Sequence, residues 1–163
     1  MAIIGLAVLF IRRIDQPNPV RATGALTGLA WATFASAWVV LYLGTVVTGS
    51  GPHAGDLDSK RNGLDPLQVS QLHADSVFLF FGLTLGLFFA LLAVGASREA
   101  RKAVVVLLAV SLAQGAIGFV QYFTDLPEIL VGFHMLGAAL VSATVTLELL
   151  TVIHSTPSRE SGA

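Results

Sequence analysis

The chain has 163 residues, a length that predicts a single domain, and its net charge of −1 gives no reason to expect nucleic acid as a partner. Hydrophobic residues make up 55% of it and charged residues only 12%, with a mean hydropathy of +0.79, values that a soluble domain would rarely tolerate. There is no cysteine, which excludes disulfides, thiolate metal sites and cysteine nucleophiles.

The apolar segments, taken in chain order, predict an all-α integral membrane protein: a four-helix transmembrane bundle with a partial N-terminal helix. Residues 1–11 are apolar, but they reach only about half of a span, and no basic residue precedes them as in a signal peptide. They resemble the end of a helix whose beginning is missing, so we expect the chain to be part of something longer. Four further segments, residues 23–48, 71–96, 102–123 and 127–153, each reach the roughly 20 residues that cross a bilayer.

Loop charges predict the orientation of this bundle. Basic residues gather in the loops at 12–22 and 97–102, whereas the loops at 49–70 and 124–128 are acidic or mixed. An excess of Lys and Arg marks the cytoplasmic side of a membrane. We therefore expect a cytoplasmic loop at 12–22, a membrane bundle at 23–154 and a cytoplasmic tail at 155–163. The predicted localisation is the cell membrane, crossed several times, with membrane lipid as a partner.

Small residues recur within the predicted spans. Gly82 and Gly86 stand four apart, Gly115 and Gly118 three apart, and Gly137 adjoins two alanines. Such residues allow helix backbones to approach closely where lipid provides no hydrophobic drive to association. They would equally make room for a flat cofactor, and of the two interpretations close packing is favoured.

Two histidines lie within these spans. His73, in QLHAD, and His134, in VGFHMLGA, stand near the outer ends of segments that both run inward, so we expect their imidazoles at similar depth. Ionisable residues inside spans are costly and usually face a functional interior. Two such imidazoles suit haem iron as axial ligands, whereas zinc would lack further ligands at that depth. The alternative is two separate histidines, each satisfied by a carbonyl or by water, and spacing alone gives it equal weight.

Three other ionisable residues are weaker candidates. His53, in the outer loop, either touches the edge of a ligand or is solvated. His154, at the end of the last segment, is expected to act as a favourable helix-end group. Glu148, near the same end, is expected to snorkel toward the membrane surface.

Polar residues near the outer end have two interpretations each. Gln121 and Tyr122 either bond to a cofactor substituent or bond between helices, and bonding between helices is favoured; Gln114 lies further inside the same segment. Lys60 and Arg61 either pair with ligand carboxylates such as haem propionates or are ordinary loop charges.

Three stretches together carry a family resemblance: LGTVVTGSGPHAGD, QLHAD and GFVQYFTDLPEILVGFHMLGA, in this order. They resemble the haem A synthase family, specifically the second half of the usual bacterial enzyme, over nearly the whole chain. The resemblance implies an eight-helix membrane protein made of two similar bundles, the second holding haem b and the first taking haem O. The family oxidises the methyl group of haem O to the formyl group of haem A, the cofactor of terminal oxidases. On this resemblance His73 and His134 are the ligands of a haem b, and residues 23–154 are a haem-binding bundle.

The glycine-rich turn after the first full span fits a lid over the porphyrin edge. Gly49, Gly51 and Gly55 permit a close approach that other residues would obstruct. The chain departs from the family pattern at Ser70 and Ala74, because the family's first half carries E-x-x-H-R around its histidine. The paired cysteines of many members are also absent. Both departures agree with a second-half identity and leave the catalytic residues unassigned.

Three interpretations of the whole chain follow. It is the haem-b-bearing half of a haem A synthase, as a fragment or a split subunit; or a half-sized member that dimerises; or a stand-alone membrane b-type cytochrome for electron transfer. The apolar start at Met1 favours the first. Expected partners are an electron donor and haem O, the latter through the missing half or a second copy.

Overall fold

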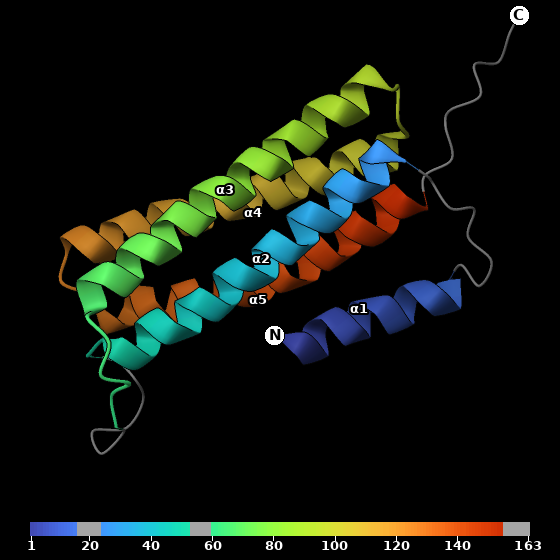
Figure 1. The fold of residues 1–163 in the computed structure, drawn as a ribbon. Helices are drawn as coiled ribbons and strands as arrows, with labels where there is room; N and C mark the ends of the chain where they lie inside the picture. The colour runs from blue at the N-terminus through green and yellow to red at the C-terminus, as the bar shows by residue number, and fades with distance from the viewer. Residues whose placement is uncertain (16–23, 53–59, 155–163) are drawn as a thin grey trace, which may run out of the picture.

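The structure is a computed structural model that describes residues 1–15, 24–52 and 60–154. This part of the chain is helical, with α1 (Ala2–Asp15), α2 (Ala25–Ser50), α3 (Pro66–Ala93), α4 (Arg98–Phe123) and α5 (Glu128–Ile153). Helices α2 to α5 form a four-helix bundle, and α1 lies against α5 on its outside (Figure 1). The four long helices are long and apolar enough to cross a membrane, the pattern of a multi-pass membrane protein. The predicted fold class is confirmed.

Capping residues determine where the helices begin. Asp65 caps α3, because its side chain accepts a hydrogen bond of 2.9 Å from the backbone N–H of residue 67, and Pro66 occupies the first turn. Ser97 caps α4 in the same way. Both helices therefore start before the apolar segments at 71 and 102, since hydropathy detects only the part that suits lipid. Similarly, α1 continues past residue 11 to Asp15, so the loop expected at 12–22 begins with helical residues.

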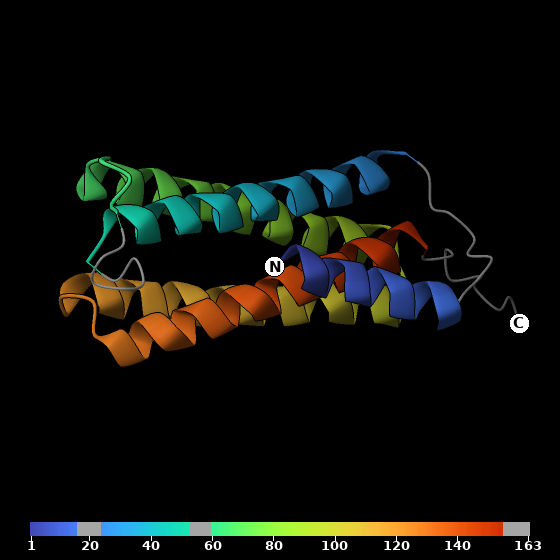
Figure 2. The same cartoon turned by 90° about the horizontal axis from the view of Figure 1, so that it is seen from below.

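Two helical hairpins make up the bundle. Helix α2 packs on α3 and α4 packs on α5, and the hairpins meet through α2 with α5 and α3 with α4. Figure 2 shows them as two layers, with α1 on the α4–α5 side. Helices α3 and α5 are therefore diagonal neighbours that run in the same direction. We refer to the end of the bundle with the α3–α4 turn as the Gly95 end, and to the opposite end as the Pro127 end.

The apolar core occupies the half of the bundle toward the Gly95 end. Its first cluster comprises Ala30, Leu87, Leu91, Ala96, Ala100, Val104, Leu149 and Val152. A second cluster adjoins it toward the middle of the bundle and comprises Ala37, Val40, Phe80, Leu107, Val141 and Val145. Toward the Pro127 end, the last buried residues of the four helices are Val40, Phe80, Ser111 and Gly137. Beyond them, Gln121 is the one buried residue in the described parts of α2 to α5. The protein thus fills one half of its bundle with large apolar side chains and leaves the other half without such a core.

The glycines differ in what they accommodate. At Gly137 the side-chain amide of Gln114 lies where a Cβ would stand, so close packing is confirmed there. Gly82 and Gly86 are instead exposed, and no atom lies within 4 Å of a Cβ at either position. The close-packing prediction is therefore wrong for that pair within the described bundle. Gly115 also has open space beside it.

Candidate functional site

His73 lies about two turns into α3, on the helix face that continues the core. Moving back from Phe80 in steps of three and four residues leads to Val77 and then to His73, as expected for one face of a helix. The imidazole contacts α2 at Gly44, where a Cβ would stand 3.4 Å from its Cε1 atom. Its Nδ1 atom is buried without a hydrogen-bond partner.

His134 occupies the corresponding place in the second hairpin. It lies on the same face of α5 as Val141, and it contacts α4 at Gly118, where a Cβ would stand 3.5 Å from Cε1. Its Nδ1 atom is also buried without a partner. Gln114, one turn before Gly118, donates from Nε2 to the backbone oxygen of His134 at 2.8 Å. The side-chain oxygen of Gln114 has no partner of its own.

The two hairpins thus repeat one arrangement: a glycine on the first helix faces a histidine on the second. His73 lies seven residues after Pro66, the first residue of α3, and His134 lies six residues after Glu128, the first residue of α5. The two helices run in the same direction. The two imidazoles therefore lie at a similar depth in the bundle. Both belong to the half of the bundle that lacks an apolar core.

The chemistry of this site suits a flat ligand held between two imidazoles. A metal-bound imidazole uses one ring nitrogen for the metal and usually donates the other N–H to a nearby acceptor. One unused acceptor lies on α4, the side-chain oxygen of Gln114, whose Nε2 atom donates to the His134 carbonyl. Small residues on the same helix faces, such as Gly115, leave space beside them. Within residues 1–15, 24–52 and 60–154, no three His, Asp or Glu side chains group together to hold a metal ion.

The remaining polar candidates on α4 differ in placement. Gln114 bonds between helices, through its donation to the His134 carbonyl. Gln121 is 6% exposed and lies one turn beyond Gly118 on the same face, whereas Tyr122 is 59% exposed and lies outside the site. Asp75 is also exposed on α3, where it accepts a hydrogen bond of 2.9 Å from Gln71.

The loop before α3 is fastened to the end of α2 by residues that sequence reasoning did not single out. Asn62 donates from Nδ2 to the Val46 carbonyl at 2.9 Å and from its backbone N–H to the Gly49 carbonyl at 3.0 Å. A Cβ at Gly49 would stand only 3.2 Å from that Nδ2 atom, so the glycine makes room for Asn62. Arg61 donates to the Pro52 carbonyl at 2.7 Å, which gives it a role within the loop, and Lys60 is exposed. His53 and Gly55 lie outside the described residues, so the lid remains a prediction.

Two candidates near the Gly95 end lie far from the histidine pair. His154 follows the last residue of α5 and stands at the helix end, as predicted. Glu148 is 0% exposed, so the prediction that it snorkels is wrong. The physical reason is its helix face, because it follows Val145 by three residues and precedes Val152 by four, and both of these are core residues.

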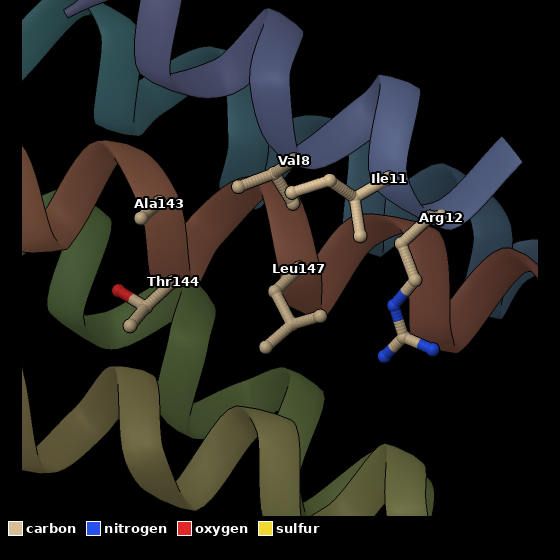
Figure 3. A pocket seen from close by; sticks show the side chains of 6 residues that line it. All are labelled: Val8, Ile11, Arg12, Ala143, Thr144 and Leu147. Atoms are coloured by element: carbon tan, nitrogen blue, oxygen red, sulfur yellow. The ribbon is translucent and has the colours of Figure 1, made fainter. Parts of the chain in front are cut away.

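An open groove between α1 and α5 is also separate from the histidine pair. Figure 3 shows its lining residues: Val8, Ile11, Arg12, Ala143, Thr144 and Leu147. The Arg12 guanidinium donates to the Thr151 hydroxyl at 3.1 Å, which links α1 to α5 toward the Gly95 end. The groove holds no imidazole and makes no part of the candidate site.

No family model, no curated protein and no solved structure matches this chain. A functional conclusion therefore rests on the residues and on their arrangement.

Proposed function

We propose that the Pro127 half of the bundle binds a haem b, with His73 and His134 as its two axial ligands. The observation that carries this proposal is the repeated pairing of a glycine with an imidazole in the two hairpins, in the half of the bundle without an apolar core. If the two histidines were merely solvated, nothing would require them to occupy matching positions or to bury their Nδ1 atoms without hydrogen-bond partners.

Each residue of the site has a task in this proposal. His73 and His134 would hold the iron, and Gly44 and Gly118 would let the helices of each hairpin approach the rings. Gln114 would fix α5 beside α4 through its bond to the His134 carbonyl. A haem with two imidazole ligands supplies one-electron transfer, because both axial positions are filled.

At the level of the whole protein, we propose that the chain acts as the second half of a haem A synthase, in the oxidation of the methyl group of haem O to a formyl group. The resemblance of its three stretches supports this assignment. Haem O would bind to a first half or to a second copy of the chain, and an electron donor would supply the haem b. Haem b, iron binding and residence in the cell membrane belong to the same proposal.

The residues around His73 also fit a second candidate function, a stand-alone b-type cytochrome. Ser70, which stands three residues before His73 where the family's first half has glutamate, carries only a hydroxyl group. Asp75 lies two residues beyond His73, about 200° around the helix, and bonds to Gln71 on an exposed face. Without a carboxylate beside the ligand face of α3, electron transfer suits this bundle better than oxidation of a methyl group.

An optical spectrum of the purified chain tests the haem site. We expect low-spin haem b in the unmodified protein, and we expect His73→Ala and His134→Ala each to remove or weaken it, because either loss opens a coordination position. His154→Ala is the matched control, since it changes a histidine at the far end of the bundle and should leave the spectrum intact. A spectrum that neither His73→Ala nor His134→Ala alters would refute the site.

A further inference from the structure

The open groove between α1 and α5 is apolar along most of its length and has a guanidinium at one end. Its apolar lining comes from Val8 and Ile11 on α1 and from Ala143 and Leu147 on α5, and Arg12 completes it (Figure 3). In that view the Arg12 side chain lies at the end of the groove away from Ala143. We refer to this feature as the α1–α5 groove.

The α1–α5 groove runs from the middle of the bundle toward the Gly95 end. The Ser142 hydroxyl donates to the Met1 carbonyl at 3.0 Å, and Arg12 donates to the Thr151 hydroxyl at 3.1 Å. Helices α1 and α5 therefore run in the same direction. At 26 residues, α5 is about 39 Å long and exceeds the roughly 30 Å of bilayer hydrocarbon, so its ends reach the headgroup layers. Thr151 is near the end of α5, whereas Ala143 lies about 12 Å deeper, so the guanidinium is at headgroup depth and the apolar lining at acyl-chain depth.

The bond to Thr151 holds the guanidinium at the end of the groove. The Thr151 hydroxyl donates its own proton to the Leu147 carbonyl at 2.7 Å, so a lone pair of its oxygen receives the N–H of Arg12. A guanidinium has five N–H donors in a planar fork, and this bond needs one of them. The same fork matches two oxygens of a phosphate group at once.

The chemistry of a phospholipid matches the groove at both depths. Its phosphate carries negative charge in the headgroup layer, where Arg12 lies, and its acyl chains run inward, where the groove is apolar. The Thr144 hydroxyl beside the groove donates to the Leu140 carbonyl at 2.7 Å, so its proton is used within α5. A zwitterionic lipid sets its own cationic group against its phosphate, so a guanidinium favours a lipid with net negative charge.

We propose that the α1–α5 groove binds one anionic phospholipid, with its phosphate on Arg12 and one acyl chain along Ile11 and Leu147. Basic loops make the Gly95 end the expected cytoplasmic end, and the anionic lipids of the cytoplasmic leaflet attract basic residues there. The bound lipid fastens α1 to α5, because it contacts both helices. The site is separate from the histidine pair, so it stands whether or not the bundle binds haem.

Native mass spectrometry of the full chain in detergent tests this site. The probes are phosphatidylglycerol and phosphatidylcholine with identical acyl chains, added in equal amounts. We expect the unmodified chain to retain one phosphatidylglycerol in preference to phosphatidylcholine. Glycerol phosphate, which has a phosphate but no acyl chain, should not be retained; its retention at the level of the lipid would indicate a site for free phosphate and contradict the proposal.

Variants test the two parts of the groove separately. Arg12→Gln removes the charge and should weaken retention of phosphatidylglycerol about fivefold, the contribution of one basic side chain near an anionic headgroup. Arg98→Gln is the matched control and should leave retention unchanged, because Arg98 is an exposed arginine at the start of α4, at the same end of the bundle but outside the groove. Ala143→Phe keeps Arg12 but fills the apolar part, so it should also weaken retention.

If Arg12→Gln does not fold, Arg12→Lys replaces it, since it keeps the charge but loses the planar fork and should still weaken retention. Four results would overturn the proposal: equal retention of the two lipids, retention by Arg12→Gln or Ala143→Phe at the level of the unmodified chain, equal weakening by Arg98→Gln, or a dimer that forms in place of the lipid complex.

Discussion

Gly137→Ala tests how tightly α4 and α5 pack beside His134. A Cβ at this position would overlap the side-chain amide of Gln114. The amide would have to move and give up its bond to the His134 carbonyl, at a cost of about 0.5–1.5 kcal/mol, and if it stays buried without a partner a further 1–3 kcal/mol or so is lost. Alanine in a helix interior is favoured over glycine by about 0.5–1 kcal/mol. The losses outweigh the gain, and we expect a net destabilisation of about 1 kcal/mol or more.

Gly82→Ala is the matched control for this substitution. Gly82 also lies inside a long helix, but it is exposed and has no atom within 4 Å of its Cβ position, so alanine should stabilise the protein by about 0.5–1 kcal/mol. The two variants should therefore differ by about 2 kcal/mol. For a chain of this length that corresponds to a gap in Tm of roughly 4–8 °C, which far-UV circular dichroism in detergent can resolve.

A double-mutant cycle assigns the effect of Gly137→Ala to its contact with Gln114. On a Gln114→Ala background the clashing amide is gone, so Gly137→Ala should become neutral or stabilising, as at Gly82. If Gly137→Ala and Gly82→Ala unfold at the same temperature in the otherwise unmodified chain, the packing described for α4 and α5 is incorrect.

Two further predictions concern topology and activity. The chain has no cysteine, so a cysteine introduced at Leu64 or at Glu99 is the only reactive thiol of its variant. We expect a membrane-impermeant reagent to label the two variants from opposite sides of the membrane. Labelling of both from the same side would contradict the topology. We also expect the purified chain, given haem O and a reductant, to form no haem A detectable by chromatography, because no carboxylate accompanies His73 on its face of α3. Haem A that forms with the unmodified chain but not with His73→Ala would show that the second-half assignment is wrong.

The helices were predictable because a long apolar run has few alternatives in a membrane, but their ends were not. Apolar runs beginning at 71 and 102 missed the first turns of α3 and α4, where Asp65 and Ser97 supply caps to polar segments that hydropathy does not detect. Glu148 shows the same weakness. The rule that charged residues near helix ends reach the surface ignores the helix face, and the spacing from Val145 to Val152 would have placed Glu148 in the core.

The two histidines could be singled out from the sequence because an imidazole inside a membrane span costs free energy, but the residues that contact them could not be predicted. An imidazole inside a span needs a reason, so His73 and His134 stood out in the sequence. That Gly44 faces the first and Gly118 faces the second depends on the register of each hairpin, which turn geometry and packing decide together. Asn62 escaped notice for a similar reason, since nothing in its local sequence indicates that it folds back onto the end of α2.

The division of the bundle into two halves follows from what holds helices together in lipid. Apolar side chains gain little by leaving lipid for one another, so association depends on close packing, hydrogen bonds and bound groups. In the Gly95 half, two apolar clusters supply that packing to all four helices. In the Pro127 half, small residues and two imidazoles replace it, and the described hydrogen bond between helices there runs from Gln114 to His134. A ligand between the imidazoles would supply the contacts that this half lacks, while the packed half keeps the hairpins aligned to receive it.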